Sequence, residues 1–83
     1  MSGIFIGGYS EDYEGDTIVA VGLNLAAVKR ETLTETKRMY GSGWQDRAWV
    51  QCYTNGSLSK LTQVLDYNRK ERRWSVRSWS VSA

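Results

Sequence analysis

The chain has 83 residues and a net charge of +2, with one cysteine and no histidine. This length suffices for a single domain, residues 1–83, with one modest hydrophobic core. The single cysteine excludes an intrachain disulfide, and without histidine the chain lacks the commonest general base and metal ligand. A charge of +2 is too small to indicate nucleic-acid binding unless the basic residues cluster locally.

The first part of the chain predicts two β-strands. Residues 4–9 and residues 17–25 carry apolar side chains at every second position, which is the period of a strand. In the second of these segments, Ala20 and Gly22 share the face opposite Val19 and Val21. Because they are small, we expect another element to pack closely on their face.

Two short segments beside these strands resemble functional motifs but lack the required spacing. Gly7-Gly8 is not followed by the lysine and the helix of a phosphate-binding loop, so it predicts a bend or bulge in the first strand. Residues 11–16 are rich in carboxylates but lack the ligand pattern of an EF-hand. We expect a solvated loop there, although such acidic groups can also imitate the phosphates of DNA.

The middle of the chain predicts one short helix. Thr32 and Glu35 have the spacing of a capping box, in which each side chain accepts a hydrogen bond from the backbone of the other, so we expect a helix from Leu33 to about Tyr40. Gly41 is suited to end it. An alternative start near Asn24 is open, because Leu25 and Val28 are also spaced as on a helix.

The last part of the chain predicts three further strands. Residues 47–54 are rich in β-forming residues, Asn55-Gly56 is a strong hairpin signal, and residues 61–67 alternate again. A helix over residues 58–65 is the competing interpretation. A polar turn over residues 68–71 then leads to a strand over residues 72–81. The predicted fold is α+β, an antiparallel sheet of about five strands with one short helix packed on it.

Several expectations concern individual side chains and the location of the protein. Cys52, inside the third predicted strand, is expected to be a small packed side chain, and Trp49 and Trp74 are expected in the core. No apolar run reaches the roughly 20 residues of a membrane-spanning helix, and the N-terminus lacks a signal-peptide pattern. We therefore expect a cytoplasmic protein without cofactor or metal.

Residues 67–79 are the most informative segment for function. They hold five of the eleven basic residues and two of the four tryptophans. Basic and aromatic side chains together can contact phosphates and stack on bases or protein rings. The candidate partner-binding residues are Lys37, Arg38, Arg69, Lys70, Arg72, Arg73, Arg77 and Trp79.

The segment Thr32-Leu33-Thr34-Glu35-Thr36-Lys37-Arg38 resembles the T-L-T-E-A-K-R segment of small phage-encoded anti-CRISPR proteins, the ninth-named family of type I-F inhibitors. In that family a strand precedes this helix, and strands with a basic-Trp ending follow it, as Arg72-Arg73-Trp74 does here. Thr36 stands in place of the family's alanine, and the last hairpin is longer here. The resemblance implies a protein without catalysis that binds an RNA-guided surveillance complex and blocks target DNA. It carries Lys37 and Arg38 over as contact residues, and also Arg72 and Arg73 through the terminal basic-Trp pattern.

Three classes of function follow. The first is a phage-type inhibitor that binds such a complex in the host cytoplasm. The second is a small nucleic-acid-binding module that uses the basic C-terminal hairpin. The third is a homodimeric structural or assembly protein that pairs through an open sheet edge. An enzyme is not expected, because no nucleophile–base pair or metal set can be assembled from the residues.

Overall fold

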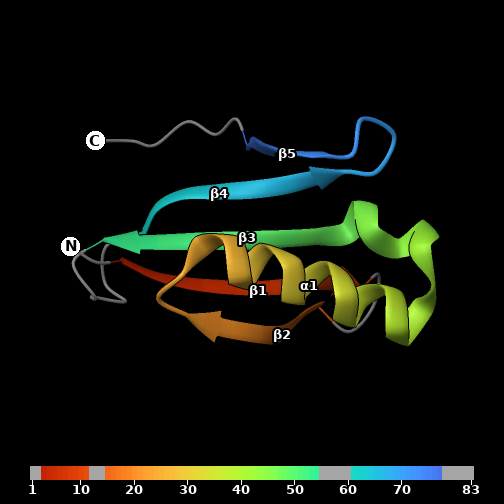
Figure 1. Cartoon of the computed structure of the whole chain (residues 1–83), viewed down its shortest axis with the longest axis horizontal. Helices are drawn as coiled ribbons and strands as arrows, with labels where there is room; N and C mark the ends of the chain where they lie inside the picture. Colours follow the sequence, from red (N-terminus) through yellow and green to blue (C-terminus); the bar gives the residue numbers. More distant parts are fainter. Residues whose placement is uncertain (1–2, 12–14, 55–60, 78–83) are drawn as a thin grey trace.

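Five antiparallel strands form one sheet in the order β2-β1-β3-β4-β5, and one helix packs across one face of this sheet (Figure 1). The computed structural model describes residues 3–11, 15–54 and 61–77. The elements are β1 (Gly3–Glu11), β2 (Gly15–Gly22), α1 (Leu25–Tyr40), the 3-10 helix η1 (Ser42–Arg47), β3 (Ala48–Thr54), β4 (Leu61–Asn68) and β5 (Arg73–Val76). The structure therefore confirms the predicted α+β class.

The core lies between α1 and the sheet. Its buried cluster comprises Ala20, Val28, Val50, Cys52 and Leu65, so the expectation that Cys52 is a packed side chain is confirmed. The helix contributes every fourth residue to this layer, because positions spaced by four share one face of a helix.

The helix approaches the sheet closely because the strands beneath it carry small residues. A methyl group built on Gly7 would lie 1.8 Å from Oγ1 of Thr32, and one built on Gly22 would lie 3.3 Å from Val28. Ala20 is buried beside them. The face of β2 that was expected to receive a packed element is thus the face on which α1 rests.

The predicted start of the helix is wrong. The helix begins at Leu25, and Asn24 caps it by accepting a hydrogen bond from the amide of Ala27 at 3.0 Å. Thr32 is not a cap: it is fully buried, and its hydroxyl donates to the carbonyl of Val28 at 2.7 Å. The alternative start near Asn24 is confirmed, and the second strand consequently ends at Gly22 and not at Leu25.

Most other predicted elements are present where the structure describes them. A register shift accompanies Gly7 and Gly8, as expected for a bulge. The strand interpretation of residues 61–67 is confirmed against the helical one, whereas η1 was not predicted. The fifth strand is shorter than predicted and ends at Val76. Residues 55–60, with the Asn55-Gly56 signal, and residues 78–81 lie outside the described residues.

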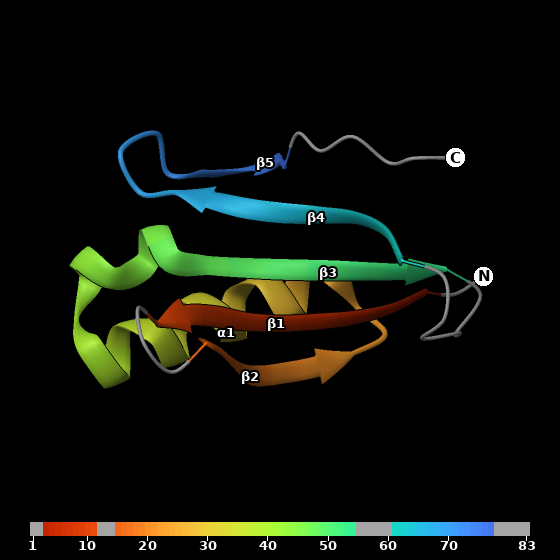
Figure 2. The same ribbon diagram turned by 180° about the vertical axis from the view of Figure 1, so that it is seen from behind.

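The two tryptophans expected in the core differ in their positions. Trp74 is half-buried and packs against the core cluster from β5. Trp49 is buried, at 4% exposure, but it lies on the sheet face turned away from α1, beside Gly8. No described helix covers that second face (Figure 2).

Candidate binding surface at the basic end

The hairpin between β4 and β5 presents a loop of charged side chains to solvent. Asn68 and Arg73 are paired at its base, and the side chain of Asn68 accepts a hydrogen bond from the amide of Glu71 at 2.9 Å. Arg72 closes the loop with a φ of 55°, a left-handed conformation that glycine or asparagine adopts more readily. All residues from 68 to 73 are exposed, which agrees with the predicted polar turn.

The 3-10 helix η1 links this loop to the end of α1. Asp46 of η1 accepts a hydrogen bond from the amide of Arg69 at 2.7 Å, and its other carboxylate oxygen lies 3.6 Å from Nε of Arg69. Gln45, the preceding residue, donates to the carbonyl of Leu33 in α1 at 3.2 Å. The loop and the last turn of α1 therefore lie at the same end of the molecule, with η1 between them (Figure 1). We call this region, with Lys37, Arg38, Arg69, Lys70, Arg72 and Arg73, the basic end.

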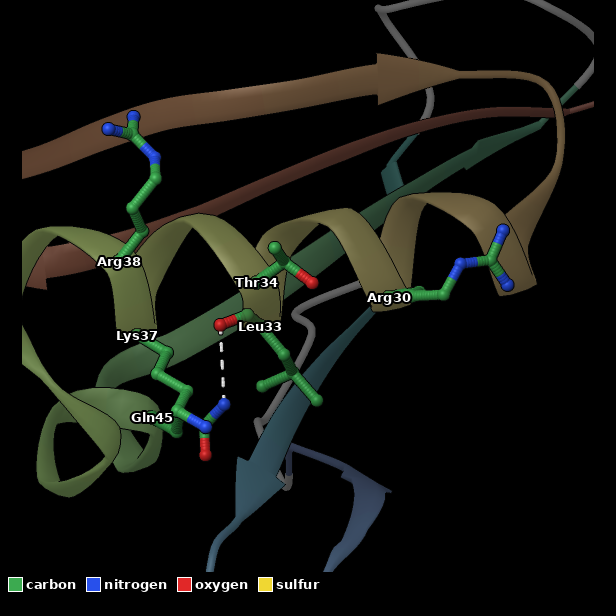
Figure 3. Close-up of a pocket in the computed structure, with 6 residues that line it drawn as sticks. All are labelled: Arg30, Leu33, Thr34, Lys37, Arg38 and Gln45. Carbon is green, nitrogen blue, oxygen red and sulfur yellow. Dashed lines mark hydrogen bonds between the residues drawn. The ribbon is translucent and has the colours of Figure 1, made fainter.

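A hollow of about 580 Å³ lies along the outer side of α1, next to η1. Its lining residues are Arg30, Leu33, Thr34, Lys37, Arg38 and Gln45. In Figure 3 the side chains of Lys37 and Gln45 lie next to each other, whereas Arg38 extends to the other side of the helix, toward β2. The hollow thus offers a cation and an amide beside the apolar side chain of Leu33.

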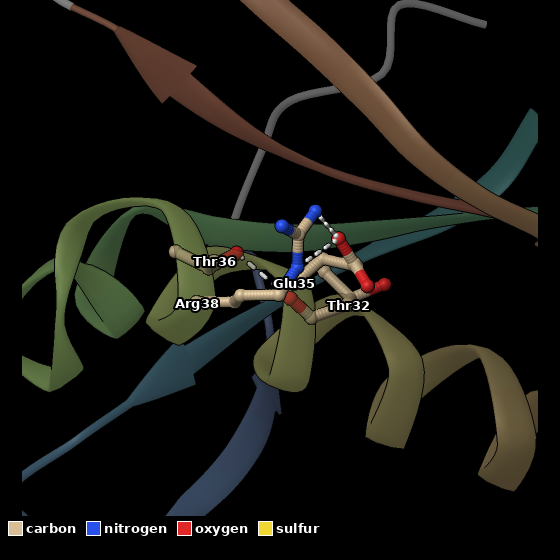
Figure 4. A network of polar contacts seen from close by, with 4 residues as sticks. All are labelled: Thr32, Glu35, Thr36 and Arg38. Atoms are coloured by element: carbon tan, nitrogen blue, oxygen red, sulfur yellow. Dashed lines mark hydrogen bonds and ion pairs between the residues drawn. The ribbon is translucent and has the colours of Figure 1, made fainter.

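Several arginines of the predicted site are paired with carboxylates of the same chain. Arg38 contacts Glu35 at 2.6 Å (Figure 4), and Arg73 contacts Glu71 at 3.1 Å. The hydrogen bond with Glu35 raises the pKa of Arg38 above its ordinary value. These exposed pairs contribute little stability, but they reduce the charge that a partner would meet.

Other cations of the basic end have no such partner. Within residues 3–11, 15–54 and 61–77, Lys37, Lys70 and Arg72 make no ion pair or side-chain hydrogen bond. They are exposed and come from two segments more than thirty positions apart in the sequence. The fold therefore places unpaired positive charge on both sides of η1 at this end of the molecule.

An aromatic stack stiffens the junction between α1 and η1. Trp44 stacks on Tyr40 at 4.5 Å, and the guanidinium of Arg47 lies 4.5 Å from the centre of the Trp44 ring. The hydroxyl of Tyr40 donates to the carboxylate of Glu11 at 2.5 Å, and this hydrogen bond raises the pKa of Tyr40. Tyr40 and Arg47 both contact the Trp44 ring, so this stack connects the end of α1 to η1.

The structure does not place all the predicted site residues together. Arg77 follows the last residue of β5 and lies on the opposite face of the sheet from α1. Its guanidinium contacts Asp66 at 2.7 Å, and this hydrogen bond raises the pKa of Arg77. Trp79 lies outside the described residues.

Sequence analysis missed Asp46 and the stacked Trp44 and Arg47, although the spacing of three between Trp44 and Arg47 is a helical signal.

Comparisons with known proteins leave the family open, because no family model, curated protein or solved structure matches the chain. Among the described residues, no helix is long and apolar enough to span a membrane. The same residues contain no group of three or more side chains placed to hold a metal ion.

Proposed function

We propose that this protein is a non-enzymatic inhibitor that binds a bacterial RNA-guided surveillance complex through its basic end and thereby blocks the binding of target DNA. The observation that carries the proposal is the group of unpaired cations, Lys37, Lys70 and Arg72, held on a firmly connected end of a small fold. A surveillance complex has both exposed RNA phosphates and a site for DNA. Positive side chains at fixed positions suit contacts with phosphates or with acidic protein groups.

The resemblance to anti-CRISPR proteins is consistent with this choice of surface. In the segment that carries it, Thr32 and Thr36 are buried against the sheet, and their hydroxyl groups bond to the helix backbone. Lys37 and Arg38 are the cations of that segment, and both are exposed on its last turn. These two cations of the segment are therefore available for contact with a partner.

A nucleic-acid-binding module is the second candidate, because the same cations can contact phosphates of free DNA or RNA. The pairing of Arg38, Arg69 and Arg73 with carboxylates argues against it, since it leaves few contacts for a phosphate backbone. Each phosphate contact contributes a slope of about −0.7 to −0.9 to the dependence of log affinity on log salt concentration. Few contacts predict a shallow slope and weak binding to free DNA.

A binding experiment separates the two candidates. The immobilised protein is mixed with a purified, guide-loaded type I-F surveillance complex after nuclease treatment, and separately with random duplex DNA at physiological salt. We expect retention of the complex and no retention of the duplex. Retention of the duplex alone would replace the inhibitor by the nucleic-acid module, and retention of neither would reject both.

Two charge-matched variants locate the surface. Arg72→Glu changes the basic end, whereas Lys29→Glu makes the same change of charge near the start of α1, at the other end of the helix. We expect the first variant to lower affinity for the complex about tenfold or more, and the control to keep it within about threefold. Equal losses in both variants would show that general charge, and not the basic end, determines binding.

A further inference from the structure

The face of the sheet that α1 leaves open carries apolar side chains on four strands, with the amide of Gln51 among them. The strand register aligns Val21 of β2 with Ile6 of β1, and Tyr53 of β3 with Ile4 of β1 and Leu61 of β4. The apolar members of this face are Ile4, Ile6, Ile18, Val21, Trp49, Tyr53, Leu61 and Val64, and we call them the open face.

Several apolar side chains of the open face are exposed to solvent in the single chain. Ile18 is 59% exposed, Val21 is 64% exposed and Leu61 is 39% exposed. On a sheet with one covered face, the other face normally alternates to polar side chains. Here β1 and β2 place isoleucine and valine on it instead, which is the composition of a sheet buried on both faces.

The charges on this side of the sheet lie near its borders, at the β4–β5 pair and at the start of β2. Asp66 of β4 is aligned with Ser75 of β5, and its carboxylate is bound by Arg77 at 2.7 Å, so the two charges compensate each other. Across β1, β2 and β3 the charged side chain aligned on the open face is Asp16, at the start of β2, and its carboxylate accepts a hydrogen bond from the hydroxyl of Ser10 at 2.8 Å. A phosphate-rich partner gains nothing there, whereas a second apolar sheet fits.

The area of the open face also fits a second sheet. Four adjacent strands about 4.8 Å apart and about 25 Å long cover roughly 500 Å². Two such faces in contact bury roughly 1,000 Å² in total, which is the lower bound for a specific protein–protein interface. An interface of this size is typical of a weak dimer, with a dissociation constant in the range of about 1–100 µM.

We infer that the protein forms a symmetric homodimer in which the open faces of two copies pack against each other. The result is a four-layer arrangement, helix–sheet–sheet–helix, with the two sheets about 10 Å apart. A two-fold axis brings the same patch of both copies together, so a mostly apolar patch whose few charges lie near its borders is self-complementary. The helices and the basic ends stay on the outside. This inference is independent of the proposed function, because the two surfaces share no residue.

Sedimentation of the full chain across concentrations from about 1 µM to about 500 µM tests the inference. We expect the wild-type protein to change from monomer to dimer within this range. Ile18→Asp and Leu61→Asp should each shift the transition to at least about tenfold higher concentration, because each places a charge in the apolar contact. Met39→Asp is the matched control: Met39 is 51% exposed but lies on α1, across the sheet from the open face, so this variant should dimerise like the wild type.

The choice of positions separates face packing from pairing of sheet edges. Ile18 lies on the edge strand β2, whereas Leu61 lies on β4, three strands away. Loss of dimer in Ile18→Asp with an unchanged dimer in Leu61→Asp would indicate pairing through the β2 edge and would overturn the inference. A wild-type protein that stays monomeric throughout the range would also overturn it. The circular dichroism spectrum of each variant establishes that it is folded.

Discussion

Adding one methyl group at Gly7 should destabilise the protein strongly, because α1 rests directly on this position. The new Cβ would lie 1.8 Å from Oγ1 of Thr32, 3.1 Å from its Cβ and 3.2 Å from Cγ1 of Val28. Rotation of the Thr32 side chain cannot remove the contact with its own Cβ, so the helix must move away from β1. Overpacking of this kind costs about 1–3 kcal/mol, and we expect Gly7→Ala to fall near about 3 kcal/mol.

That loss is large for a chain of this length. An 83-residue domain has a free energy of unfolding of about 4–12 kcal/mol. With a urea dependence of about 1–1.5 kcal/mol/M, the midpoint of urea unfolding should fall by about 2 M or more. Gly43→Ala is the control, because no atom lies within 4 Å of a Cβ built on Gly43 and the position has no positive φ. It should change stability by less than about 0.5 kcal/mol.

A double-mutant cycle identifies the cause of the loss. Thr32→Ala alone should cost about 1 kcal/mol, since it removes a buried methyl group but adds a good helix former. In Gly7→Ala/Thr32→Ala the clashing oxygen is absent, so the double variant should lose at least about 1 kcal/mol less stability than the sum of the losses in the two single variants. Strict additivity, or a Gly7→Ala protein as stable as Gly43→Ala, would refute the close packing of α1 on β1.

Three further predictions concern the helix start, the basic loop and the Tyr40 hydroxyl. Asn24→Ala should cost about 1 kcal/mol in urea unfolding because it removes the observed cap, and an unchanged midpoint would place the helix start elsewhere. Arg72→Gly relieves the positive φ of 55°, so thermal melting should show equal or higher stability; a clear loss would contradict the loop conformation. The hydrogen bond to Glu11 raises the pKa of Tyr40 above its ordinary value of 10.0, so the stability it contributes is fully present below that pH and is lost as the pH rises through the raised pKa. Phenolate absorbance in alkaline titration should therefore show one tyrosine that ionises late in the wild type, and no such tyrosine in Tyr40→Phe. If the two proteins lack any difference in late ionisation and in stability at alkaline pH, the raised pKa of Tyr40 is contradicted.

The alternation of apolar residues was sufficient to predict the strands, because strand period depends on local sequence alone. Ile4, Phe5 and Ile6 lie on the faces that their alternation predicts, and so do Trp74 and Arg73. The class of fold followed from five such segments and one helical one. The order of strands in the sheet did not follow, because it depends on which apolar faces meet at long range.

The helix start was mispredicted because a local motif competed with a tertiary contact. Thr32 and Glu35 have the spacing of a capping box, yet Thr32 is buried over Gly7, a residue 25 positions earlier in the chain. Asn24 was available as an equally good cap, and the packing of Leu25 and Val28 against the core favours the earlier turns of the helix.

The candidate site could be predicted in composition but not in arrangement. The basic residues were evident from their clustering, and their exposure in the hairpin followed from the turn. Their electrostatic state could not be predicted, because Arg69 is paired with Asp46, which lies 23 positions away, and Arg77 with Asp66 across a strand pair. Only the fold separates the neutralised arginines from Lys70 and Arg72.

The central claim, that the basic end prevents DNA binding by a surveillance complex, is tested most directly by competition. A guide-loaded type I-F complex is incubated with the wild-type protein or with Lys70→Glu/Arg72→Glu, and binding of labelled target duplex is then measured in a mobility-shift assay. We predict that the wild-type protein abolishes the shifted band at a modest excess over the complex, and that the variant, at the same concentration and with an unchanged circular dichroism spectrum, leaves most of the DNA bound. Full DNA binding in the presence of the wild-type protein, or equal inhibition by both proteins, would contradict the account.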